Sequence, residues 1–396
     1  MRSALWLYLF MFVAFFDLHA QYPILTPFAI SLGAVPSFIG YIMGMYSITH
    51  LPGNMLAGYG VDRFGGKWFI VCSLILAGCL LMVQSRVNDP WELLWIRSIS
   101  GFVLAFLSPA CLAMLAKMAT DRVHQSKLMT GNGLVHTLAS VVSPAAGAAL
   151  VAKTGFSLAF EILGWGLIAC GVMAVFFVHD QKPARTPFSS AEREHQQAAQ
   201  DFSTLRPATS SRDMSILFFC IPLALACSQG ILFFEVPLTL RDGPNMVMST
   251  GLLFSIVSLG ALVSLSMWFL NRIPASTRLL AGTITLALLF FALSIQWPVS
   301  LSVTLFFIGM SKGITFPAIA SSLAEQSNHA RYGKQFAILS IAYSIGAFFG
   351  PVIAGELREW ISPYFAAFLI LLLGTTLLPP KHRRTRLDLS PSSTPK

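Results

Sequence analysis

The stretch Gly58-Tyr59-Gly60-Val61-Asp62-Arg63-Phe64-Gly65-Gly66-Lys67 separates two long apolar segments, residues 36–57 and 68–85. It places one acid, two bases and four glycines within ten residues. In a chain this apolar, we expect a short loop at a membrane surface, where glycines let two helix ends approach closely and turn sharply. Its acid and its arginine are expected to cap helix ends or to pair with charges on neighbouring loops.

The composition excludes a soluble fold. Hydrophobic residues make up 55% of the chain and charged residues only 11%, against roughly 25% charged in a soluble domain. Apolar segments recur along the chain, each near the ~20 residues that a helix needs to cross a bilayer. The segment 4–30 is expected to be the first spanning helix and not a signal peptide, because it is long, carries Asp17 and lacks a clear small-residue cleavage site.

The fold predicted from these segments is an all-α polytopic membrane protein with twelve spanning helices in two six-helix halves. The N-terminal half is 1–178, a charged cytoplasmic linker is 179–213, the C-terminal half is 214–379, and 380–396 is a disordered tail. A short amphipathic helix is expected near 189–202. The spans are expected at 4–30, 36–60, 68–86, 91–118, 127–152, 156–178, 214–240, 246–270, 277–296, 299–325, 333–357 and 362–379.

The lysines and arginines predict the orientation. Most of the 26 fall on the face that the N-terminus shares, while the other face receives only Arg86, Lys153, Arg241 and Arg358. Such a bias predicts that both termini are cytoplasmic, in the plasma membrane, which for a bacterium is the inner membrane. It also explains the net charge of +9 without a nucleic-acid partner.

Several other classes of function are not expected. All six cysteines fall within apolar segments, which favours small packing residues over a disulfide framework or a zinc site. We find no phosphate-binding loop of the G-x-x-x-x-G-K-[ST] kind, so ATP-driven transport by this chain alone is not expected. The linker is too short and polar for a catalytic domain. We therefore expect no enzyme, no metal and no cofactor, and a monomer whose partners are a small-molecule substrate, protons and lipid.

An internal repeat supports the division into halves. Proline is frequent enough to align by chance, but four landmarks share offsets between 207 and 210 residues and occupy matching places in their helices. The pairs are Pro109 with Pro317, Pro144 with Pro351, Asp62-Arg63 with Asn271-Arg272, and Pro27 with Pro237.

The charged stretch resembles the signature loop of the major facilitator superfamily, G-x-x-x-D-R-x-G-x-K. Gly58, Asp62, Arg63, Gly65 and Lys67 fill every fixed position. The resemblance implies two parallel six-helix halves around a central cavity, with these residues acting in the conformational switch. It also implies that the first, fourth, seventh and tenth helices line the cavity.

Two further segments resemble motifs of the same family. Arg97 followed by Gly101 resembles the fourth-helix motif, whose arginine is associated with proton transfer in proton-coupled members. Pro144 and Gly147 resemble the antiporter signature of the fifth helix, although Ser or Ala replaces Gly at several points, and Gly350 and Pro351 are their counterparts in helix eleven. Small residues with proline allow tight, bendable packing, which is the alternative explanation of these segments.

Charged and titratable residues within spanning helices are costly and usually functional. Here they fall on helices that the resemblance places around the cavity and on their flanking neighbours. They are Asp17 and His19 in helix one, His50 in two, Arg97 in four, His136 in five, Glu235 in seven and Lys312 in ten.

Asp17 and Arg97 are predicted to meet and to couple transport to protons, with His19 as a neighbour. Asp17 lies thirteen residues from the start of its span, or ~20 Å, which is roughly 10 Å below the outer surface. Arg97 lies six residues into its span, or about 9 Å from that surface. Burial favours a neutral acid and a nearby guanidinium favours its anion, so the balance can differ between two conformations. A static ion pair is the alternative.

Lys312 lies thirteen residues into helix ten, with no obvious acid at its depth. It could be neutral through desolvation, paired by the fold, or a site for an anionic substrate group. Arg97, Glu235 and His136 are further candidates for substrate contacts, although a lone helical histidine more often packs. Tyr22, Phe234 and Phe316 could line an aromatic wall, although most such rings also pack.

These observations predict a secondary transporter, with proton-coupled export of a small organic molecule by alternating access as the preferred activity. Drug efflux and export of a secreted metabolite such as a metallophore both stay open. One alternative is uptake or exchange of an organic anion anchored by Arg97 and Lys312. Another is a membrane receptor or scaffold that has lost transport, against which the retained charges argue.

Overall fold

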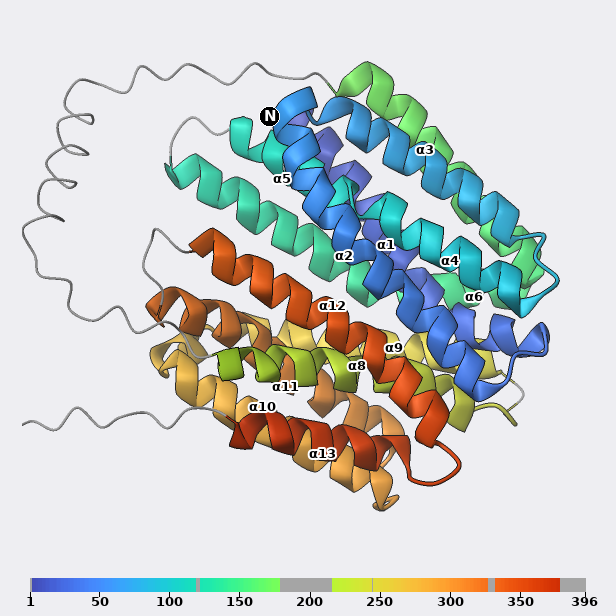
Figure 1. Ribbon diagram of the computed structural model, residues 1–396, viewed down its shortest axis with the longest axis vertical. Helices are drawn as coiled ribbons and strands as arrows, with labels where there is room; N and C mark the ends of the chain where they lie inside the picture. The colour runs from blue at the N-terminus through green and yellow to red at the C-terminus, as the bar shows by residue number, and fades with distance from the viewer. Residues whose placement is uncertain (1, 119–121, 179–215, 244, 327–331, 378–396) are drawn as a thin grey trace, which may run out of the picture.

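The computed structural model describes residues 2–118, 122–178, 216–243, 245–326 and 332–377. Within these ranges the chain is an all-helical bundle, and its first half lies beside its second (Figure 1). The predicted linker 179–213, the amphipathic helix near 189–202 and the tail 380–396 lie outside the described residues.

The N-terminal half follows the predicted spans closely, with one break inside the fourth. The helical hydrogen bonding is interrupted at Ala105 and Phe106, which keep helical backbone angles, because Pro109 has no amide hydrogen for the carbonyl of Ala105 and its ring would clash there. The predicted single helix 91–118 is therefore two helices. The helices are α1 (Arg2–Ser31), α2 (Pro36–Phe64), α3 (Lys67–Gln84), α4 (Pro90–Leu104), α5 (Leu107–Lys117) and α6 (Arg122–Phe177).

The longest helix, α6, contains two spans. Gly155 sits inside it with φ of 80° and ψ of 173°, a left-handed backbone that a side chain would strain. The fifth and sixth spans therefore reverse direction at this residue, as the sequence predicted for the gap between 152 and 156.

The C-terminal half repeats the arrangement. Its eighth span ends in a short 3₁₀ turn, so the predicted helix 246–270 is α-helical only to Ser266. The elements are η1 (Ile216–Phe219), α8 (Cys220–Thr239), α9 (Met246–Ser266), η2 (Trp268–Arg272), α10 (Ala275–Ser294), α11 (Leu301–Gln326), α12 (Tyr332–Leu357) and α13 (Pro363–Thr376).

The described helices account for twelve passes. Nine are long and apolar enough to cross a membrane, and one of these, Lys127–Phe177, contains the break at Gly155 and so makes two passes. The charged and polar α2 and the shorter α13 supply the others. The predicted twelve-helix architecture agrees with this count.

The charged stretch is mostly helical, and not the loop that we predicted. Helix α2 runs to Phe64, and the turn is confined to Gly65, whose φ is 87°, and Gly66. A Cβ on Gly66 would lie 2.7 Å from the side chain of Met114, so glycine is needed for close packing. Arg63 donates to the Tyr59 hydroxyl at 3.0 Å, a partner on its own helix and not on a neighbouring loop.

The two halves meet chiefly along two pairs of helices, α2 with α12 and α6 with α9, and α1 also contacts α8 and α9. We name the two ends of the bundle by their turns. The motif face holds the Gly65–Gly66 turn and the start of α1, and the opposite face holds the turns at 32–35, at 155 and at 358–362.

Backbones of the two halves touch near the opposite face. A Cβ on Gly40 of α2 would collide with the Pro351 carbonyl of α12, and one on Gly355 would lie 2.6 Å from the Pro36 carbonyl. Gly58 lies on the same side of α2 as Gly40, because 18 residues make five helical turns. It has nothing within 4 Å of its would-be Cβ. The halves are therefore in close backbone contact at the opposite face, and Gly58 has no such contact at the motif face.

Candidate functional site

A buried polar cluster joins α1 to α4. The Gln21 amide nitrogen donates to Asp17 Oδ2 at 2.9 Å, and Arg97 Nη1 donates to Gln21 Oε1 at 2.7 Å. The three side chains are 2–4% exposed. A single glutamine thus holds the acid and the guanidinium in one hydrogen-bonded chain.

The predicted meeting of Asp17 and Arg97 occurs through this bridge. Among the described residues they form no direct ion pair, because Arg97 reaches α1 at Gln21, one turn closer to the opposite face than Asp17. Gln21 is not among the residues predicted from the sequence. The signal was present, since a polar residue four positions after a buried acid shares its helix face.

Two atoms of this cluster have no hydrogen-bond partner. They are Asp17 Oδ1 and Arg97 Nε, both fully shielded from solvent. The Arg97 guanidinium also lies 4.7 Å from the centre of the Tyr46 ring, a cation–π contact. A buried carboxylate with one free oxygen can accept a proton, and a partly satisfied guanidinium can change partners.

The polar side chains continue along α2 toward the motif face. The ring of His50 lies 5.8 Å from that of Tyr46, and its Nδ1 is 2.9 Å from the Asn54 amide nitrogen. Tyr46, His50 and Asn54 follow one another at four-residue intervals, so they share one side of the helix.

The histidines of α1 and α6 lie against each other. The rings of His19 and His136 are 5.2 Å apart and nearly perpendicular, and His19 Nδ1 lies 2.7 Å from the Phe15 carbonyl oxygen. His136 also meets the ring of Phe15 at 4.7 Å. His19 thus lies two residues from Asp17 but bonds to the backbone.

Lys312 of α11 lies over two aromatic rings. Its Nζ is 5.7 Å from the centre of Phe233 and 6.0 Å from that of Phe316. No ion pair to Lys312 occurs within the described part of the chain. Tyr22 of α1 stacks on Phe233 at 4.3 Å, and Tyr343 of α12 stacks on Phe316 at 5.5 Å.

The aromatic wall differs from the prediction by one residue. Phe234 is 0% exposed and belongs to the hydrophobic core, so it does not line this cluster. Its neighbour Phe233 contacts both Tyr22 and Lys312. Both phenylalanines are equally apolar in sequence, and only the rotation of α8 decides which of them faces α1.

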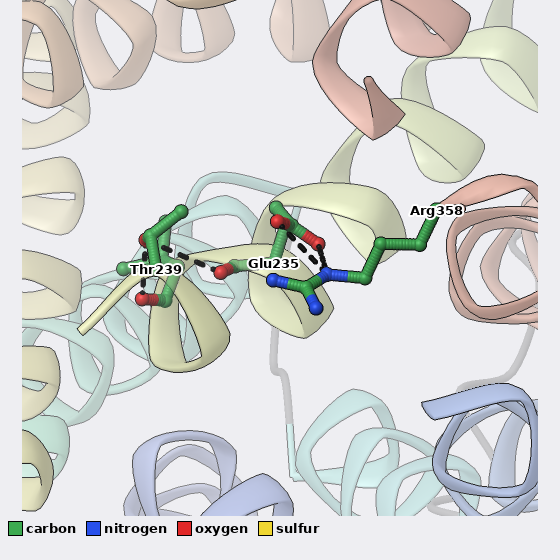
Figure 2. Close-up of polar contacts among 4 residues, drawn as sticks. Glu235, Thr239 and Arg358 are labelled. Atoms are coloured by element: carbon green, nitrogen blue, oxygen red, sulfur yellow. Dashed lines mark hydrogen bonds and ion pairs between the residues drawn. The ribbon is translucent and has the colours of Figure 1, made fainter. Parts of the chain in front are cut away.

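Glu235 forms an ion pair with Arg358 at the opposite face (Figure 2). Arg358, just past the end of α12, places Nε 3.1 Å from Glu235 Oε2 and 3.3 Å from Oε1. The carboxylate is therefore engaged within the C-terminal half, and its predicted contact with substrate would require that pair to open. One helical turn further on, the Thr239 hydroxyl bonds to α8 backbone carbonyls, including that of Glu235 at 3.3 Å.

The predicted switch residues in α6 and α12 lie at close helix contacts. A Cβ on Gly147 would lie 2.7 Å from that of Ala20 in α1, and one on Gly350 would collide with the Cys227 carbonyl of α8. Pro351 meets Gly40 of α2, and the Pro144 carbonyl of α6 approaches Gly251 of α9. These four residues therefore lie at close contacts between helices, where a change in the angle between two helices would alter the packing.

No cluster of three or more potential metal ligands occurs among the described residues. The six cysteines are all free.

A family model described as Major Facilitator Superfamily matches residues 7–295 and 279–394. Multidrug resistance protein 2 of Bacillus subtilis is 22% identical over 384 residues, covering 93% of this chain and 92% of that protein. A multi-drug resistance efflux pump PmrA homolog of Lactococcus lactis is 23% identical, covering 84% of this chain and 80% of that protein.

Solved structures share the fold. A D-xylose–proton symporter superposes with a TM-score of 0.69 at 15% identity, with 94% of each chain covered. The nucleoside transporter NupG superposes with a TM-score of 0.70 at 15% identity, covering 95% of this chain and 98% of that one. At these identities the likeness shows the fold alone.

Proposed function

Because the chain belongs to the major facilitator superfamily and is a membrane transporter and not an enzyme, we propose that it exports a small organic molecule in exchange for protons. The membrane is the plasma membrane, which in a bacterium is the inner membrane, and both termini are cytoplasmic. The observation that carries the proposal is the buried Asp17–Gln21–Arg97 chain, which links a proton-accepting group to two helices.

Protonation would change the partners within this chain. As an anion, Asp17 accepts from the Gln21 amide, which leaves Oε1 free to accept from Arg97. A neutral Asp17 can donate to Gln21 Oε1 instead, which competes with Arg97 and releases the guanidinium. The two protonation states then favour different arrangements of α1 and α4, which is the differential interaction that any switch requires.

The separation of the halves supports alternating access. The placement of lysines and arginines assigns the motif face to the cytoplasm. The tight backbone contacts of Gly40 and Gly355 then close the outer side, while the open space at Gly58 leaves the inner side accessible. The structure corresponds in this proposal to an inward-facing conformation, the state in which an exporter takes up its substrate.

The names of the relatives favour export, since two of them are multidrug resistance or efflux proteins. The fold does not decide the direction, because one structural neighbour is a proton symporter. Uptake or exchange of an organic anion is the second candidate, and the observation that favours it is the absence of an ion pair to Lys312 among the described residues. A non-transporting receptor would have no use for the buried charges of Asp17 and Arg97, whose burial is costly.

Substrate profiling in inverted membrane vesicles tests the direction and the coupling. We expect accumulation of the substrate inside such vesicles when their lumen is acidic, and little accumulation without a pH gradient. If the accumulation of every substrate tested is the same with and without an imposed pH gradient, proton exchange is contradicted.

Cysteine labelling tests the orientation on a cysteine-free background. A cysteine at Asn245, in the turn before α9, should react with a membrane-impermeant maleimide from outside whole cells. A cysteine at Gln125, on the motif-face end of α6, should react only after the cells are opened. The reverse pattern would overturn the assignment of the two faces.

A further inference from the structure

Lys312, at the centre of the bundle, is a cation that no carboxylate among the described residues neutralises. Among the described side chains of the N-terminal half, Asp17 is the buried acid, and its Oδ2 accepts a hydrogen bond from Gln21, which bridges it to Arg97. Glu235 is paired with Arg358 at the opposite face. Lys312 lies about 17 Å along α11, midway through it, and no carboxylate within the described residues pairs with it.

Aromatic contacts alone do not satisfy this ammonium group. Its two rings, Phe233 and Phe316, lie at 5.7 and 6.0 Å, near the outer limit of a cation–π contact. Such contacts are much weaker than the hydration that a buried charge gives up. An anion at Lys312 would supply the missing partner, and its interaction would be strengthened by the low local dielectric.

Flat rings from both halves surround the same point. Tyr22 of the N-terminal half stacks on Phe233 of the C-terminal half at 4.3 Å, and Phe316 stacks on Tyr343 at 5.5 Å. A planar ring can replace one partner of such a stack without loss of contact. The rings therefore offer a place for an aromatic group directly beside the ammonium.

Two histidines complete the surroundings. The ring of His19 lies 5.7 Å from that of Tyr22, and the ring of His136 lies 5.2 Å from that of His19. A neutral imidazole can donate one hydrogen bond to an anionic oxygen. No acid is among the groups that face Lys312 in these contacts, so nothing there competes with an anion.

We propose that the site formed by Lys312, Phe233, Phe316, Tyr22 and the His19–His136 pair binds an aromatic organic anion, a planar ring that carries a carboxylate or a similar group. This inference rests on the proposed function, since it names the class of substrate that the transporter carries. Export of such an anion in exchange for protons moves net positive charge inward, so the membrane potential and the pH gradient both drive it.

Equilibrium binding to the purified full chain in lipid nanodiscs tests the site without any gradient. Four probes separate charge from ring: naphthoate, the neutral naphthamide, the cationic naphthylmethylammonium and the non-aromatic cyclohexanecarboxylate. We expect naphthoate to bind most tightly. Lys312→Met should weaken naphthoate about ten-fold or more while changing naphthamide less than about two-fold, because only the anion loses a charged partner.

The matched variants separate a direct contact from a general defect. Lys312→Arg should retain the preference for naphthoate over naphthamide, and Lys153→Met, at an exposed lysine, should leave every affinity unchanged. Phe233→Leu should weaken naphthoate and naphthamide together, because both lose the ring contact. If Lys312→Met does not fold, the ranking of the four probes on the wild-type chain still decides.

Several outcomes would overturn the inference. They are equal affinity for naphthoate and naphthamide, tighter binding of naphthylmethylammonium, and equal weakening of both aromatic probes by Lys312→Met. Failure of the proposed function looks different. Naphthoate would then bind in a Lys312-dependent manner, but its movement in vesicles would carry no protons.

Discussion

Replacing Asp17 by asparagine should abolish proton coupling while leaving a folded protein that still binds substrate. Asparagine has nearly the same shape, and its Oδ1 can accept the hydrogen bond that Gln21 now donates at 2.9 Å. It cannot gain or lose a proton, and its amide nitrogen can donate to Gln21 Oε1 as a neutral acid would, so the cluster no longer responds to pH. The variant therefore isolates the charge of Asp17 from its packing.

The expected cost in stability is small. A hydrogen bond to a charged acceptor contributes about 1.5–3 kcal/mol and a neutral one about 0.5–1.5 kcal/mol, so the Gln21 contact loses roughly 1–1.5 kcal/mol. Removing a buried charge offsets part of that loss, because the side chain is only 2% exposed and its Oδ1 has no partner. Loss of coupling should therefore not reflect unfolding.

The assay is the number of protons moved per substrate in proteoliposomes, with a pH-sensitive dye inside and labelled substrate outside. The ratio should fall to zero in Asp17→Asn, with substrate affinity retained. Glu235→Gln is the control, because Glu235 is also buried and acidic but is paired with Arg358. It should keep the wild-type ratio. A wild-type ratio in Asp17→Asn would refute the reasoning and place coupling at Glu235 or His19.

Two further predictions rest on particular contacts, and a third rests on the charged stretch of the sequence. Arg358→Met should lower the unfolding temperature in detergent, because it leaves Glu235 buried without a partner. The cost is about 1–3 kcal/mol, less than for a fully buried ion pair because Arg358 is partly exposed. An unchanged unfolding temperature would contradict this. Gly40→Ala should lower the population of the conformation that is closed at the opposite face by roughly ten-fold, which would be measured as a longer spin-label distance between α2 and α12. Gly166→Ala is the control and should leave that distance unchanged, because Gly166 has open space around it. Asp62→Asn should slow turnover more than it weakens equilibrium binding, and normal turnover with weakened binding would exclude a role in conformational cycling.

The division into two halves of spanning helices could be read from the sequence, because a bilayer imposes its thickness on every span. Apolar length located each pass, and glycine or proline located most ends. Where prediction failed, the cause was local. Pro109 divides a helix that looked continuous by length, and the charged stretch stays helical to Phe64, with the turn confined to Gly65 and Gly66.

The candidate site was only partly predictable. Asp17, Arg97 and Lys312 could be singled out from the sequence, because each is a charged residue inside a predicted spanning helix. Such residues are costly to bury and are usually functional. Their partners depend on where each helix is placed and how it is rotated. Gln21 becomes the bridge because α4 meets α1 one turn away from Asp17, and Phe233 replaces Phe234 at the wall because consecutive residues on α8 point about 100° apart.

The sequence by itself therefore determined the number of passes, the family and the residues that are costly enough to need a function. Only the tertiary structure decided that Asp17 and Arg97 share a glutamine, that Glu235 is occupied by Arg358, and that Lys312 faces rings and no acid. The physical reason is that crossing a membrane is a property of each segment alone, whereas a hydrogen bond depends on the depth and rotation of two helices at once.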